Sequence, residues 1–160
     1  MDFNESEFLP QEWLIELGKI TQSWVNFEML LNLLLGKLAG FDQPFETIPS
    51  ILITHSSFPQ RLDMFAALCE SKLPDYPKLA NYREVLILAR TAQSSRNKFT
   101  HNQIGVAGCA PGHGQVGKVS ARGKLKQELE AISLDDLRKT TNLIVEAGRA
   151  MCVLVLASEN

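Results

Sequence analysis

The hexapeptide from Arg96 to His101 reads Arg-Asn-Lys-Phe-Thr-His and brings three kinds of reactive group close together. An arginine guanidinium binds phosphate through a planar, always charged fork of donors. A histidine imidazole gives or takes a proton near neutral pH. Together these two groups can cleave RNA without a metal ion, so Arg96 and His101 are candidate catalytic residues, and the carboxamide of Asn97 is the third polar group beside them.

Helical geometry sets a condition on this site. The hexapeptide lies near the end of a predicted helix, and five residues at about 100° each leave Arg96 and His101 roughly 140° apart on an ideal helix. The two side chains therefore converge only if the helix ends or bends between them. Otherwise a second copy of the chain must supply the other half of the site.

Long helices are predicted to position the hexapeptide. The first runs from Gln11 to about Ala39, and Gly40 is expected to stop it. Its apolar residues recur at alternating steps of three and four, which predicts a buried core helix and is compatible with dimerisation. The members of this heptad stripe are Leu17, Ile20, Trp24, Phe27, Leu31, Leu34 and Leu38.

Three further helices and one weaker segment follow the first. Ile48 to Thr54 is either a short helix or an extended run, and the helix is favoured. A helix from about Phe58 to Ser71 follows a serine cap. Pro77 starts a helix that is predicted from Lys78 to about Asn102. The last helix begins at a capping box formed by Ser133 and Asp136, and it reaches about Ala157.

Residues 104–126 differ from the rest and predict a β-hairpin arm before the last helix, with a turn over residues 111–114. The second limb of the arm is basic. Together with Lys98, its Lys118, Arg122 and Lys124 are the candidate RNA-binding residues. The alternative is a solvated strand face, because Glu128 and Glu130 soon offset the positive charge.

Composition limits the classes of function. The chain has 160 residues and a net charge of −2, so no global positive field indicates nucleic-acid binding. Residues 1–160 are interpreted as a single domain with a loose tail over residues 1–10. The acidic start lacks the features of a signal peptide, no apolar run could span a membrane, and scattered cysteines favour a cytoplasmic protein. We expect no metal site and no cofactor, since no ligand motif is present.

A purely structural role for the hexapeptide remains open. His101 near a helix end could stabilise the helix dipole. Arg96 could pair with a carboxylate such as Glu84 or Glu28. Glu28 itself lies on the flank of the apolar stripe, where a solvated position is favoured.

The string Arg96-Asn97-x-x-x-His101 resembles the Rx4–6H motif of HEPN domains, an all-α family. The wider pattern is similar to an uncharacterised bacterial branch of that family. It includes Trp24 and Phe27-Glu28 on the first helix and a segment from Ser57 to Asp63. It continues with a strand from Lys118 to Lys124 and a helix start at Leu134-Asp-Asp-Leu137. The resemblance covers most of residues 11–157.

The resemblance implies an all-α bundle of about four to five helices with the small β-hairpin arm. It implies a metal-independent endoribonuclease whose composite site forms across a homodimer and leaves 2′,3′-cyclic phosphate ends. Arg96 would bind the scissile phosphate, His101 would move protons, and Asn97 would orient the phosphate or the imidazole. An antitoxin protein is an expected partner. The alternative is a noncatalytic dimer that binds nucleotide or a protein, because fold alone does not fix function.

Overall fold

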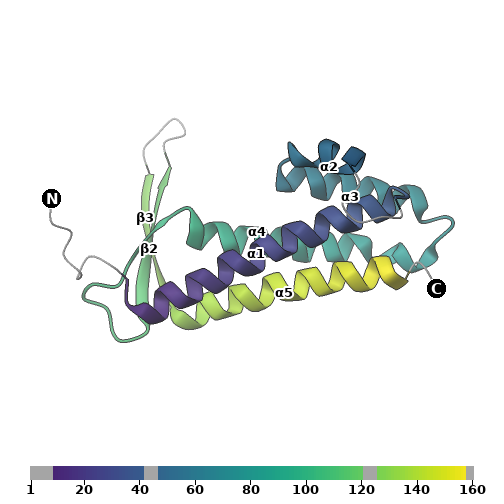
Figure 1. Ribbon diagram of the computed structural model, residues 1–160. Helices are drawn as coiled ribbons and strands as arrows, with labels where there is room; N and C mark the ends of the chain where they lie inside the picture. Colours follow the sequence, from purple (N-terminus) through teal and green to yellow (C-terminus); the bar gives the residue numbers. More distant parts are fainter. Residues whose placement is uncertain (1–8, 42–46, 121–125, 158–160) are drawn as a thin grey trace.

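Two long helices, α1 (Gln11–Leu38) and α5 (Leu134–Ala157), lie side by side along the length of the molecule (Figure 1). The computed structural model describes residues 9–41, 47–120 and 126–157. Helix α4 (Tyr82–Thr100) packs against α5 and, less extensively, against α1. At one end of the bundle lie α2 (Thr47–Thr54) and α3 (Phe58–Lys72), and α3 packs against α1. The chain is thus mostly helical, as predicted.

Helix α1 has the predicted length and the predicted buried face. Every member of the heptad stripe is buried except the half-buried Leu17. Gly40 adopts a φ of 89°, and two backbone bonds close the end of the helix: Gly40 N–H donates to Lys37 O, and Phe41 N–H to Gly36 O. This paired pattern is a Schellman motif, which requires the left-handed conformation that glycine adopts without strain.

The cap residues predicted for α3 and α5 are confirmed. The Ser57 hydroxyl accepts from Gln60 N–H, while the Gln60 side chain accepts from Ser57 N–H at 2.7 Å. Ser133 N–H donates to the Asp136 carboxylate at 2.9 Å, and Asp136 N–H donates back to the Ser133 hydroxyl. Each pair satisfies backbone donors that a helix start would otherwise leave free.

The helix that carries the hexapeptide is shorter than predicted at both ends. Its first turn is a separate 3-10 helix, η2 (Pro77–Asn81), and α4 begins only at Tyr82. At the other end α4 stops at Thr100, whereas the prediction extended to Asn102. His101 is the first non-helical residue, with φ −118° and ψ 5°.

The expected two-stranded antiparallel hairpin is present, and a third strand extends it into a three-stranded sheet. Strand β1 (Gln103–Gly105) pairs with β2 (His113–Ser120), and β2 pairs with β3 (Lys126–Ser133), which the sequence did not predict. The predicted turn is also wrong in detail, since His113 and Gly114 already belong to β2. The sheet stands at the end of the bundle away from α2 and α3 (Figure 1).

The sheet is packed onto the start of α1. Val116 and Ile132 on its inner face are buried beside Trp13, which is 1% exposed. Gly114 lies so close that a Cβ there would be 3.0 Å from both the Trp13 ring and the Gly105 carbonyl oxygen. The packing of this end therefore fixes the sheet relative to α1. No helix in the described part of the chain is long and apolar enough to cross a bilayer.

Candidate functional site

The Arg96 and His101 side chains meet at the C-terminal end of α4. Arg96 Nη1 lies 2.9 Å from His101 Nε2. They meet because the helix ends between them, at Thr100, which meets the condition set by the helical spacing within one chain. A guanidinium has no acceptor, so this contact is a hydrogen bond only when Nε2 accepts and the ring proton sits on Nδ1.

Asn97 and Asn102 hold this helix end together. Asn97 Oδ1 accepts a hydrogen bond from Arg96 Nη1 at 3.1 Å, so the same guanidinium nitrogen touches both Asn97 and His101. The Asn102 amide donates to Lys98 O at 2.9 Å, and His101 N–H donates to Asn97 O. These bonds satisfy carbonyls that the end of a helix leaves without partners.

The guanidinium of Arg96 is seated on an aromatic ring. Its Cζ lies 5.4 Å from the centre of the Trp24 ring on α1, within cation–π distance. The Arg96 Nε atom is buried and has no hydrogen-bond partner among the described residues. Neither Glu84 nor Glu28 forms a recorded ion pair with Arg96 in the described part of the chain, so the predicted structural alternative of a carboxylate pair is not seen there.

Glu28 binds Arg61 instead of Arg96. The Glu28 carboxylate accepts from Arg61 at 2.5 Å, and Arg61 also donates to Asn32 at 2.9 Å. The Glu28 side chain is half-buried, which corrects the expectation of a solvated helix face. Phe58 connects the two regions, because its ring lies 4.5 Å from the Trp24 ring and within 5.9 Å of the Arg61 guanidinium.

An open hollow of about 500 Å³ lies beside His101. Its lining comes from α4, from the residues after α4 and from the inner face of the sheet. It includes Ser94, Asn97, Lys98, His101, Lys118 and Glu130. His101 is exposed, so its ring is accessible from solvent.

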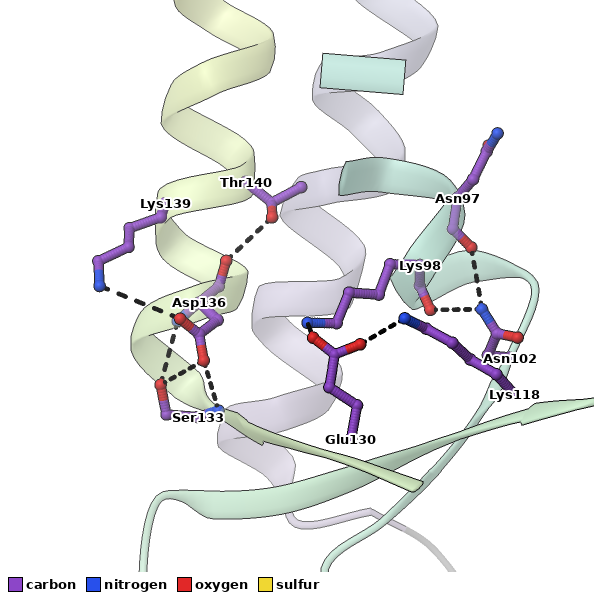
Figure 2. Close-up of polar contacts among 9 residues, drawn as sticks. All are labelled: Asn97, Lys98, Asn102, Lys118, Glu130, Ser133, Asp136, Lys139 and Thr140. Carbon is purple, nitrogen blue, oxygen red and sulfur yellow. Dashed lines mark hydrogen bonds and ion pairs between the residues drawn. The ribbon is translucent and has the colours of Figure 1, made fainter. Parts of the chain in front are cut away.

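Glu130 on β3 binds two lysines at the hollow (Figure 2). Lys98 of α4 donates to one carboxylate oxygen at 2.6 Å, and Lys118 of β2 donates to the other. These bonds, from Lys118 first and then Lys98, lower the pKa of Glu130 from its ordinary value to about 2. Glu130 therefore stays ionised at neutral pH.

Asp136 stabilises the junction between β3 and α5 nearby (Figure 2). Burial alone would raise the pKa of this carboxyl group, but hydrogen bonds from the Ser133 hydroxyl and backbone hold it below its ordinary value. The Asp136 carboxylate therefore stays ionised and can accept the hydrogen bonds that cap the start of α5.

The predicted RNA-binding residues have different outcomes. Lys98 and Lys118 both line the hollow, while Arg122 and Lys124 lie outside the described residues. From the sequence, Glu130 is interpreted only as offsetting the charge of the basic limb. The pairing of β2 with β3 and the packing of α4 bring it into direct contact with Lys118 and Lys98. Among the described residues, no three His, Cys, Asp or Glu side chains gather as metal ligands would.

Comparison of the chain with protein-family models, curated proteins and solved structures finds no match. The resemblance to HEPN domains therefore rests on the residues quoted above alone.

Proposed function

We propose that the protein is a metal-independent endoribonuclease of HEPN type that acts in the cytoplasm. The observation that supports this most directly is the 2.9 Å contact between Arg96 Nη1 and His101 Nε2 at the end of α4. It places a fixed positive charge beside a group that can transfer protons, next to an open hollow. Cleavage of RNA by its own 2′-hydroxyl needs both.

The reaction assigns one role to each side chain. Arg96 turns from His101 to a non-bridging oxygen of the scissile phosphate, which frees the Nε2 lone pair. His101 Nε2 then takes the proton of the 2′-hydroxyl, whose oxygen attacks phosphorus. The bond to the 5′-oxygen breaks, and that oxygen receives a proton from a second imidazole or from water. Asn97 orients the guanidinium, and the products are a 2′,3′-cyclic phosphate and a 5′-hydroxyl.

A homodimer would complete the site by supplying the second imidazole. Several apolar side chains of α1 are exposed on the face opposite its buried stripe, among them Leu14, Ile15, Val25 and Met29. A face of this kind is compatible with pairing between two copies of α1. An antitoxin protein that covers the same cleft belongs to this proposal as a partner.

The test is cleavage of mixed structured and unstructured RNAs in the presence of EDTA. Wild type is compared with Arg96→Ala, Arg96→Lys and His101→Ala. We expect wild type to leave cyclic phosphate ends and each variant to lose about 10²-fold or more in rate, since general acid–base catalysis alone contributes that much. Arg96→Lys keeps the charge but loses the planar fork, so it should also fail.

Arg90→Lys is the matched control on the same helix. Arg90 is exposed and pairs with Asp63 at 2.7 Å, away from the hollow. The Arg90→Lys variant should therefore cleave RNA like wild type. Cleavage that EDTA abolishes, or full activity of His101→Ala, would show that the proposal is wrong.

A second candidate function is a noncatalytic dimer that binds nucleotide or a protein partner. The observation that favours it is that the Nε2 lone pair of His101 already accepts a bond from Arg96. A ring held in this way is not free to take a proton. This candidate predicts saturable binding of nucleotides, measured by calorimetry, without any cleavage of RNA. It also predicts that a folded His101→Ala variant binds as well as wild type.

A further inference from the structure

Glu130 lies where two separate parts of the fold bring positive charge together. Val116 of β2 is directly opposite Glu130 in the sheet, so Lys118, two residues on, is its diagonal neighbour on the same face. Long side chains bridge such diagonal positions. Lys98 reaches the same carboxylate from the last turn of α4. Figure 2 shows the two ammonium groups on either side of Glu130.

The rest of the hollow is suited to an anion. Its described lining offers hydroxyl, amide, imidazole and ammonium groups, and Glu130 is its only acidic side chain. A carboxylate and a phosphate present similar oxygens to an ammonium group. The position between Lys98 and Lys118 therefore matches what one phosphate would need, and Glu130 occupies it.

We propose that the hollow is a subsite for a backbone phosphate of the RNA substrate, and that Glu130 is an internal anion which the phosphate must displace. The identity of the substrate rests on the proposed function; the anion subsite rests on the side chains around the hollow. The phosphate bound there lies beside His101 and next to the scissile one. Glu130 thereby weakens nonspecific binding of other anions.

Exposure makes this displacement feasible. The side chain of Glu130 is 43% exposed and that of Lys118 is 42% exposed, so the pair is in contact with water. Ion pairs in such positions contribute little to stability, and their long side chains move readily. Because Glu130 remains ionised at neutral pH, protonation does not open the subsite, and only a competing anion does.

The experiment measures binding of a fluorescent single-stranded DNA oligonucleotide by anisotropy at low salt. DNA lacks the 2′-hydroxyl, so the proposed reaction cannot consume the probe and binding is measured apart from cleavage. The variants are Glu130→Gln, which keeps the shape of the side chain and removes its charge, and the double variant Lys98→Ala with Lys118→Ala. Glu128→Gln is the charge-matched comparison, because Glu128 is an exposed residue of the same strand and face that lies opposite Lys118 but forms no ion pair with either lysine among the described residues.

We expect Glu130→Gln to bind the oligonucleotide about threefold to tenfold more tightly than wild type, and more so at low than at high salt. Glu128→Gln should tighten binding clearly less than Glu130→Gln does, because Glu128 does not occupy the position between the two lysines. The double lysine variant should bind the oligonucleotide about tenfold or more weakly than wild type. Pyrophosphate should compete with the oligonucleotide for Glu130→Gln at lower concentration than for wild type.

Each other result overturns the proposal in an identifiable way. Unchanged or weaker binding by Glu130→Gln would show that Glu130 only braces the sheet against α4. If Glu130→Gln and Glu128→Gln tighten oligonucleotide binding equally, the effect comes from the loss of a negative charge in general and not from the position of Glu130. Glu130→Asp, whose carboxylate is one methylene shorter, should show a smaller gain and serves if Glu130→Gln folds poorly. If the binding pattern holds while wild type cleaves no RNA, the nuclease proposal fails and the phosphate subsite stands.

Discussion

One nitrogen atom, Arg96 Nη1, contacts both the imidazole and the carboxamide of the candidate site. Because arginine only donates, a hydrogen bond between these two side chains requires the His101 tautomer with its proton on Nδ1 and an accepting Nε2. The ring is thus oriented before substrate arrives. If the protein is the proposed nuclease, a phosphate that draws Arg96 away would release the lone pair in the same movement and so couple substrate binding to activation of the base.

Glu130 gives a prediction at the scale of one residue. Its pKa is lowered from 4.5 to about 2 in the folded protein, so the ionised form is favoured by folding. Its contribution to stability is present above about pH 4.5 and is lost as pH falls toward 2. Since the carboxylate is exposed, that contribution should be at most about 1 kcal/mol.

Urea unfolding of wild type and Glu130→Gln at pH 7 and near pH 3 measures this contribution. We expect wild type to be slightly more stable at pH 7 and the difference to shrink at the lower pH. A difference that does not change with pH would mean that the ion pairs with Lys98 and Lys118 do not stabilise the folded state.

At the scale of elements, the helices and the pairing of β1 with β2 were largely predictable, and the third strand, β3, was not. The heptad stripe and the glycine after α1 are strong local signals, and the cap residues Ser57 and Ser133 mark helix starts directly. Strand β3 carries Lys126-Gln-Glu-Leu-Glu, which contains few residues that favour strands, and only Ile132 on it is buried. Its strand conformation comes from pairing with β2, which no local pattern encodes.

The site was predictable in its residues but not in its geometry. The motif located Arg96, Asn97 and His101, yet their convergence depends on the helix ending at Thr100, and helix ends are uncertain by a residue or two. The contact between Lys98 and Glu130 joins residues 32 positions apart. Contacts of that separation follow from tertiary packing alone.

Gly114 gives a prediction about how the sheet is held on α1. A Cβ there would meet the Gly105 carbonyl oxygen and the Trp13 ring at 3.0 Å, so Gly114→Ala should destabilise the protein by roughly 1–3 kcal/mol. Gly117→Ala is the control on the same strand, because its Cβ would meet nothing closer than 3.8 Å. Thermal or urea unfolding compares them, and equal stability of the two variants would exclude the proposed close packing.

At the scale of the whole molecule, the question is which chain supplies each reactive group. The exposed apolar face of α1 is compatible with the proposed dimer, while the 2.9 Å contact joins Arg96 and His101 of the same chain. We therefore expect light scattering to give twice the mass of one chain. Within that dimer, each scissile phosphate should be handled by an Arg96 and a His101 from one chain, with the partner contributing only the second proton transfer.

A mixed dimer separates these roles. Arg96→Ala and His101→Ala chains, each with a different affinity tag, are expressed together and the heterodimer is purified through both tags. Neither chain then carries an intact pair, so we expect no recovery of RNA cleavage, since a guanidinium on the partner cannot take the place of one that lies 2.9 Å from the ring. A heterodimer of wild type with His101→Ala, prepared in the same way, tests whether one intact pair is enough. Recovery in the first heterodimer would mean that the reactive pair forms across the interface, and that the contact within one chain belongs to the resting state.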